Sequence, residues 1–337
     1  MVGPIIQLAD LMNSSSLFSG SLMAVNELMG DSLDEESPSD QSSGDKVELP
    51  PLKNAVKMSG IKFRYGPKLP DVLQDVDANF DKGSYNVVMG ESGSGKSTVL
   101  NLLMRFHQPY QGSIKWDGTD IFSTSLKSFR EQVAVMFQET MIYQGTVRDN
   151  ILFGMPDEPG AVEKAARDAE IHEVIQGLPD GYDTRIGGDE LIALSGGQQQ
   201  RICMARALYR KPTMLLLDEG EMNVFLHFMF VRFLKLVLTR NIEYLIRSFH
   251  LSYVAPAATS ALDGKTEKSI IDTVVKLRDD NGLTVVSVTH RPATAIKANK
   301  VIMLRVGGTV AEEGSYDELV SREGAFKRLV DISKDED

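Results

Sequence analysis

One octapeptide of the chain contains the residues needed to hold phosphate groups. Residues 90–97 read Gly-Glu-Ser-Gly-Ser-Gly-Lys-Ser and fit the pattern G-x-x-x-x-G-K-[ST]. The glycines let the backbone curl so that successive N–H groups point at phosphate oxygens. In such a loop Lys96 reaches the β- and γ-phosphates, and Ser97 is a ligand of Mg²⁺. The pattern predicts a nucleoside triphosphate site formed by Gly90, Glu91, Ser92, Gly93, Ser94, Gly95, Lys96, Ser97 and Thr98.

The residues around this loop supply the setting that it requires. Residues 84–89 predict a short buried strand before the loop, and the pattern from Thr98 to His107 predicts a helix after it. A helix N-terminus adds its positive end to a phosphate site. Strand and helix patterns alternate from Val56 onward, which predicts an α/β domain with ligands at the carboxyl ends of its strands.

A pair of carboxylates forms the second candidate group. Residues 214–217 are Met-Leu-Leu-Leu, which is typical of a buried parallel strand, and Asp218 and Glu219 follow directly. At the end of such a strand we expect Asp218 to hold Mg²⁺ through its water shell. We expect Glu219 to polarise the attacking water as a general base.

A third motif lies between these two groups. Residues 194–198 are Leu-Ser-Gly-Gly-Gln, and a helix is predicted from Ile202 to Tyr209. With this motif the chain resembles the ATP-binding cassette (ABC) family. The resemblance implies that the motif caps the γ-phosphate held by the phosphate loop of a second domain. A serine hydroxyl and glycine N–H groups ahead of a helix suit such an anion. The residues in question are Ser195, Gly196, Gly197 and Gln198.

The resemblance also assigns single residues outside the three motifs. It implies that Tyr65 stacks on adenine, that Gln138 contacts Mg²⁺ and the attacking water, and that His290 holds the γ-phosphate. Ser260 and Asp263 resemble the loop that crosses to the partner domain. The implied ligands are ATP and Mg²⁺.

The implied fold is α/β, with the three-layer core of the phosphate-loop NTPases, an antiparallel β subdomain and an α-helical subdomain. Segments 145–151, 178–184, 308–314 and 324–326 are similar to the exporter branch of the family. The implied function is therefore ATP hydrolysis that powers transmembrane transport through a head-to-tail dimer. The expected partners are an ABC transmembrane domain, missing from this chain, and a second nucleotide-binding domain, identical or homologous, at the cytoplasmic face of a membrane.

The N-terminal residues differ in composition from the rest. Residues 1–30 have apolar residues at helical spacing and resemble the cytoplasmic end of a last transmembrane helix, so we expect a fragment without its membrane domain. Residues 31–52, rich in Asp, Glu, Ser and Pro, predict an acidic flexible linker.

Much of the net charge of −11 falls within these N-terminal residues, and no basic patch in the chain indicates nucleic-acid binding. A single cysteine, Cys203, excludes an internal disulfide framework. We expect the nucleotide-binding domain over residues 53–337.

Residues 220–257 interrupt the family pattern between Glu219 and Ala-Thr-Ser-Ala-Leu-Asp at 258–263. Three interpretations are open: a retained intron or gene-model error, a genuine insert with an amphipathic helix against a membrane or partner, and a ligand site around His227 and His250. The insert separates the expected general base from the partner loop, and displacements of about 1 Å can cost a hundredfold in rate. The alternative function is therefore a non-hydrolysing or non-transport ABC fragment that binds ATP without coupled transport.

Overall fold

The computed structural model describes residues 47–137, 140–187, 192–218 and 264–335. The chain divides into two units after Val47, and the second unit contains all of the elements below. Several predictions fall outside the described residues: the helix at 1–30, most of the linker at 31–52, the insert at 220–257, and the site residues Gln138, Glu219, Ser260 and Asp263.

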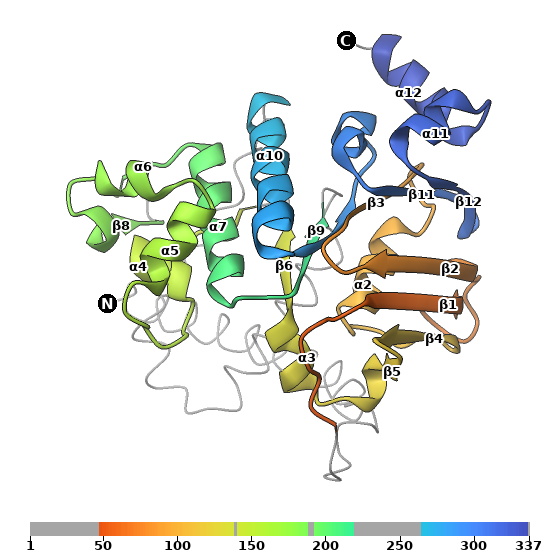
Figure 1. Cartoon of the computed structure of the whole chain (residues 1–337), viewed down its shortest axis with the longest axis horizontal. Helices are drawn as coiled ribbons and strands as arrows, with labels where there is room; N and C mark the ends of the chain where they lie inside the picture. Colours follow the sequence, from red (N-terminus) through yellow and green to blue (C-terminus); the bar gives the residue numbers. More distant parts are fainter. Residues whose placement is uncertain (1–46, 138–139, 188–191, 219–263, 336–337) are drawn as a thin grey trace, which may run out of the picture. The chain divides into compact units, whose positions relative to one another are not determined.

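A six-stranded sheet with the order β12-β11-β3-β10-β9-β6 forms the centre of the second unit (Figure 1). Its strands are β3 (Tyr85–Gly90), β6 (Val133–Phe137), β9 (Met214–Asp218), β10 (Thr284–Val288), β11 (Lys300–Arg305) and β12 (Thr309–Gly314). The pair β11–β12 is antiparallel, and the other pairs are parallel. Every residue of β3 and β10 is buried, and both strands are mostly apolar, with Asn86, Thr284 and Ser287 as buried polar residues.

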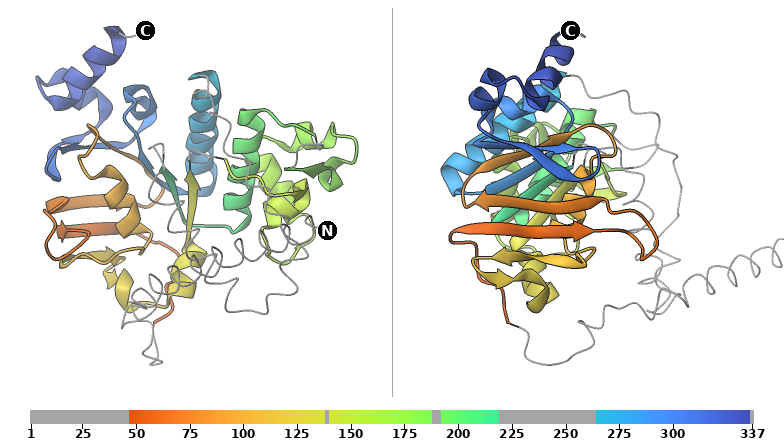
Figure 2. Two further views of the ribbon diagram at one scale, coloured as in Figure 1. Left: turned by 180° about the vertical axis from the view of Figure 1, so that it is seen from behind. Right: turned by 90° about the vertical axis from the view of Figure 1, so that its right-hand side faces the viewer.

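Helices cover both faces of this sheet (Figure 2). One face packs against α2 (Lys96–Leu103), α3 (Leu126–Gln132) and a second sheet. The other face packs against α7 (Gly196–Tyr209), α10 (Gly264–Asn281), α11 (Tyr316–Ser321) and α12 (Ala325–Asp335). The same apolar cluster continues into α4 (Val147–Leu152), α5 (Ala161–Asp168) and α6 (His172–Gln176), of which α4 and α5 pack against α7. Short 3-10 helices join these elements at Ile121–Ser123 (η1), Gly181–Asp183 (η2) and Pro292–Lys297 (η3).

The second sheet is antiparallel, with the order β2-β1-β4-β5. Its strands are β1 (Ala55–Phe63), β2 (Leu73–Asp81), β4 (Gln111–Trp116) and β5 (Thr119–Asp120). Asp117 lies in the turn between β4 and β5, and its carboxylate accepts N–H groups from Lys53, Asn54 and Ala55 at 2.7, 2.8 and 3.0 Å. Burial acts to raise the pKa of Asp117, but these N–H donors together lower it.

One end of the predicted linker belongs to the folded unit. Leu49 and Leu52 are buried, and the Leu49 N–H donates to Ser128 Oγ at 3.0 Å. Two leucines in an otherwise polar segment were enough to bring residues 49–52 onto the core, because burying a leucine side chain contributes ~1.5–3 kcal/mol.

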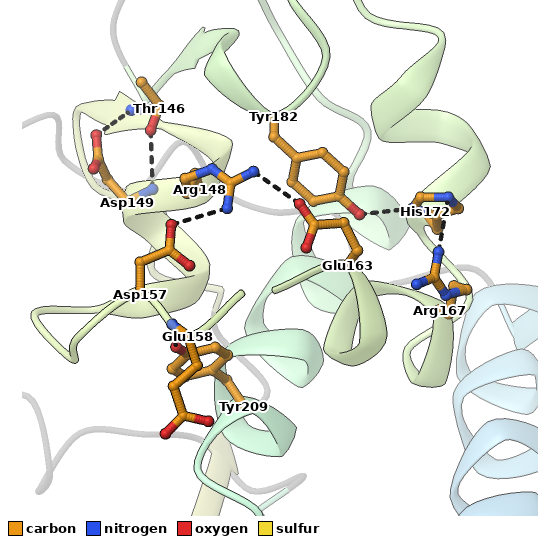
Figure 3. Close-up of polar contacts among 10 residues, drawn as sticks. All are labelled: Thr146, Arg148, Asp149, Asp157, Glu158, Glu163, Arg167, His172, Tyr182 and Tyr209. Atoms are coloured by element: carbon orange, nitrogen blue, oxygen red, sulfur yellow. Dashed lines mark hydrogen bonds and ion pairs between the residues drawn. The ribbon is translucent and has the colours of Figure 1, made fainter. Parts of the chain in front are cut away.

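Helices α4 to α7, with the short strands β7 (Gly145–Thr146) and β8 (Arg185–Ile186), form what we call the helical region. Polar side chains tie its outer helices together (Figure 3). Arg148 lies 3.0 Å from Asp157 and 2.8 Å from Glu163, and Nδ1 of His172 lies 2.7 Å from Oη of Tyr182. Burial, reinforced by the charge of Glu163, raises the pKa of Tyr182 to about 12, so its hydroxyl stays protonated at neutral pH.

Two helices differ in extent from the sequence prediction. The helix expected to reach His107 ends at Leu103, because Arg105 adopts a left-handed conformation with φ 57° that a helix cannot continue. Conversely, α7 begins at Gly196, six residues before the predicted start at Ile202. In the described part of the chain, no helix has both the length and the apolar character needed to cross a membrane.

Candidate functional site

Three of the predicted site segments meet at one edge of the six-stranded sheet. Val88 of β3 is in register with Val288 of β10, and Val288 is in register with Asp218 of β9. Adjacent strands lie ~4.8 Å apart. Gly90 follows Val88 by two residues and His290 follows Val288 by two. The phosphate loop, Asp218 and His290 therefore lie at the carboxyl ends of three neighbouring parallel strands.

The path of the phosphate loop depends on two glycines. Gly90 has φ 155°, and a Cβ there would lie 2.5 Å from Leu304 O and from Ser94 Oγ. Gly95 has φ 92°, and a Cβ there would lie 2.7 Å from Leu73 Cδ2. A side chain at Gly90 would clash with backbone, and a side chain at Gly95 would be strained by the left-handed φ and by its close neighbours. Gly95 is also the N-cap of α2 and places no side chain on the first N–H groups of that helix, as an anion site requires.

Lys96 and Ser94 point into this loop. Lys96 Nζ donates to Gly90 O at 2.8 Å and to Glu91 O at 2.9 Å, so its charge bridges the loop. Burial lowers the pKa of Lys96, while the negative charge of Asp218 raises it. The buried Ser94 Oγ has no hydrogen-bond partner among the described residues. A buried, unpaired hydroxyl beside a lysine is a suitable donor set for a phosphate oxygen.

Ser97 and Asp218 provide the oxygen atoms suited to Mg²⁺. Ser97 is exposed in the first turn of α2, and Asp218 is half-buried at the end of β9. In the described segments, no group of three or more His, Cys, Asp or Glu residues could hold a metal ion. One hydroxyl and one carboxylate nevertheless suit Mg²⁺, which keeps several waters and takes phosphate oxygens as further ligands. Phe137, the residue before Gln138, is in register with Asp218.

His290 is exposed, but the backbone around it is fixed. The Thr289 N–H donates to Val88 O at 3.2 Å, and Thr289 Oγ1 accepts the Arg291 N–H at 2.9 Å. These bonds connect the turn after β10 both to β3 and to itself. The imidazole therefore extends from a rigid turn beside the phosphate loop.

The Ser195 segment forms the cap of α7. Ser195 Oγ accepts the Gln198 N–H at 3.3 Å, and Gln198 Oε1 accepts the Ser195 N–H at 2.9 Å, which is a capping box. Gly196 and Gly197 are the first two helical residues. The Gln198 side chain thus has a structural role in shaping the turn that presents Ser195, which is exposed.

The expected base platform, Tyr65, is 44% exposed. Its hydroxyl lies 3.0 Å from Thr98 Oγ1, so the buried Thr98, which was predicted among the ATP-binding residues, contacts Tyr65. Asn101 and His107 also contact Tyr65. Neither was predicted, because nothing in the sequence links residues that lie 36 or more positions apart.

Residues 73–221 match the family model of the ABC transporters. This part of the chain is therefore an ABC transporter domain. Its fold is the α/β fold of the ABC ATPases, as predicted, with the antiparallel sheet and the helical region flanking the phosphate-loop core.

Three relatives of this ABC domain illustrate its place in the family. The ATP-dependent lipid A-core flippase of Chromohalobacter salexigens is 32% identical over 330 residues, covering 98% of this chain and 48% of the flippase. The sophorolipid transporter of Starmerella bombicola is 36% identical over 291 residues, covering 83% of this chain and 19% of the transporter. The solved structure of a bacterial Atm1-family ABC exporter with ATP bound matches with a TM-score of 0.66 and 28% identity, covering 86% and 43% of the two chains. The chain thus spans less than half the length of these relatives.

Proposed function

We propose that this ABC domain binds and hydrolyses ATP with Mg²⁺ and thereby powers the export of a substrate across a membrane. The observation that carries the proposal is the convergence of the Lys96 loop, Asp218 and His290 at the ends of three adjacent parallel strands. Ligands of open α/β sheets bind at this edge. The similarity to full-length ABC transporters supports the coupling to transport.

Each residue of this edge has a distinct role in the proposal. Lys96, Ser94 and the first N–H groups of α2 bind the β- and γ-phosphates. Ser97 and Asp218 hold Mg²⁺, with Gln138 as a further contact, and the metal neutralises charge on the phosphates. Glu219 orients and polarises the attacking water. His290 holds the γ-phosphate.

A second copy of the domain, identical or homologous, completes the site. The exposed Ser195 and the glycine N–H groups at the start of α7 form a capped helix N-terminus suited to the γ-phosphate bound by the partner. Catalysis of phosphoryl transfer is mostly positioning and charge stabilisation. Hydrolysis therefore depends on a head-to-tail pair, which a transmembrane partner at the cytoplasmic face aligns.

The proposal is tested with the Lys96→Ala variant. Removal of this ammonium should abolish ATP binding or turnover, because the remaining donors of the loop are uncharged. The matched control is Lys164→Ala on α5, which loses only an exposed ion pair with Asp168. ATP affinity and phosphate release are measured for the full chain. Turnover that survives in Lys96→Ala contradicts the assignment.

The alternative, ATP binding without hydrolysis, rests on residues 220–257, which follow Asp218 and Glu219 directly in the sequence. It predicts that the chain binds ATP but releases no phosphate, and that deletion of 220–257 increases the rate. Equal rates with and without the segment contradict this alternative.

A further inference from the structure

The ring of Tyr65 is held on several sides although it remains largely exposed. Phe63 and His107 pack against it at nearly right angles, with centroids 4.9 and 5.2 Å away. Its hydroxyl is 3.0 Å from Thr98 Oγ1 and accepts the Asn101 side-chain amide at 3.3 Å. Edge-to-face aromatic pairs and hydrogen bonds both favour one orientation of a side chain over others. These contacts fix both the hydroxyl end and the plane of the ring.

The loop around Tyr65 is anchored in the same way at the preceding residue. Arg64 forms an ion pair with Asp71 at 3.0 Å and lies over the ring of Tyr110 at 4.3 Å. The Tyr110 hydroxyl donates to Asp71 at 2.9 Å. Tyr110, like His107, belongs to the segment that follows α2. Two consecutive loop residues are therefore attached to this one segment.

The residues that hold Tyr65 come mostly from the element that carries the phosphate loop. Thr98 and Asn101 belong to α2, which begins at Lys96, and His107 follows that helix closely in the chain. Purely structural packing would bury the ring, as it does for the neighbouring Phe63, which is 4% exposed. Tyr65 is instead held rigidly with 44% of its surface open. This is the arrangement expected of a stacking platform.

We propose that Asn101 and His107 are positioning residues for nucleotide recognition, which hold the Tyr65 ring in the orientation that stacks on a base. The inference rests on the proposed ATP-binding function. In this arrangement Tyr65 and the phosphate loop form one rigid unit, so that the base and the phosphates of ATP are bound at a fixed spacing.

The test compares the affinity for ATP with that for inorganic tripolyphosphate, which has no base. Base stacking contributes ~1–3 kcal/mol, so Tyr65→Leu should weaken ATP binding about 5- to 150-fold and leave tripolyphosphate binding unchanged. Asn101→Ala and His107→Ala should each weaken ATP binding about 2- to 12-fold, again without an effect on tripolyphosphate. His107→Phe should restore most of the affinity, because it retains an aromatic ring.

A double-mutant cycle separates positioning from general damage. In the Tyr65→Leu background, Asn101→Ala and His107→Ala should have no further effect on ATP affinity. Matched controls are Asn79→Ala on β2 and His172→Ala on α6, neither of which contacts Tyr65 in the described structure. If His107→Ala does not fold, the Asn101→Ala cycle alone decides the question.

Three results overturn the proposal: equal weakening of ATP and tripolyphosphate binding, effects that persist in the Tyr65→Leu background, or normal ATP affinity in Asn101→Ala. Failure of the proposed function looks different, because Lys96→Ala then binds ATP and turns it over like the unaltered chain. Loss of ATP binding in Lys96→Ala together with unchanged affinity in Asn101→Ala refutes the positioning role alone.

Discussion

The phosphate loop and the Ser195 segment are positioned by different forces. The loop follows β3, whose residues are all buried, and its turns are set by close backbone approaches at Gly90 and Gly95. The Ser195 segment begins α7, which packs in the apolar core and is also tied to the segment before it by directional polar contacts. Its Arg206 donates to Asn150 O at 2.7 Å and to Met141 O at 2.9 Å.

Aromatic rings complete the environment of Arg206. Its guanidinium lies 5.1 Å from the ring centroid of Tyr143 and 5.0 Å from that of Phe153. Asn150, only 2% exposed, bonds to the same guanidinium and to the backbone of Tyr143. A packed strand edge resists small displacements in every direction, whereas hydrogen bonds and stacked cations fail when single groups are removed. The helical region is therefore the more vulnerable to the loss of a side chain, and the phosphate loop is the more vulnerable to added volume.

The largest loss of stability is expected for Asn150→Ala, a substitution in α4 of the helical region. The change leaves buried partners, including Tyr143 N–H and an Arg206 nitrogen, without a hydrogen bond. Each unpaired group costs ~1–3 kcal/mol, so we expect a loss of about 2–4 kcal/mol in the free energy of unfolding. Urea unfolding measures it, with Asn79→Ala as the control because the Asn79 amide donates to Asp81 at an exposed position. Similar losses in both variants contradict the comparison.

The next largest loss of stability is expected for Gly95→Ala, which adds a methyl group to the phosphate loop. A methyl group there meets Leu73 Cδ2 at 2.7 Å, and the left-handed φ adds strain, for a total of ~2–3 kcal/mol. Gly93→Ala is the matched control, because its φ is 78° but nothing lies within 4 Å of an added Cβ. Strain alone costs ~1–2 kcal/mol. Thermal and urea unfolding of the pair should show a larger loss for Gly95→Ala, and equal losses exclude a role for the close approach.

Arg148→Ala tests the weaker, exposed polar contacts of the helical region (Figure 3). The variant loses ion pairs to Asp157 and Glu163, whose side chains are 42% and 26% exposed. Pairs at such exposure contribute ~0.2–1 kcal/mol each and are screened by salt. We expect a loss of about 1 kcal/mol at low ionic strength that shrinks at high ionic strength. A loss independent of salt indicates packing of the arginine stem against Tyr182 instead.

The smallest effect expected is the contribution of His107 to the pH dependence of the free energy of unfolding. Burial lowers its pKa below the ordinary 6.5, so between the two values the unfolded chain binds a proton that the folded chain does not. Stability should be unaffected well above pH 6.5 and should decrease as pH falls through that value. His107→Phe should remove this part of the slope. Urea unfolding at several pH values compares the two proteins, and parallel curves contradict the assignment.

Local patterns predicted much of this domain, and contacts between distant segments accounted for most of what was missed. The strand and loop around Lys96 were predicted because a short motif specifies them. The start of α7 was missed because two glycines concealed a helix that the Ser195 capping box initiates. The Asn101 and His107 contacts to Tyr65 depend on how α2 packs beside β1, which no local pattern contains.

Asp117 has a mechanical consequence for the domain. Its carboxylate binds three successive N–H groups of the entering chain, at residues 53–55. A pull on the segment before them is therefore carried into the turn between β4 and β5. The antiparallel sheet is therefore one of two anchors for such tension, and the other is α3, which the Leu49 N–H reaches through Ser128 Oγ.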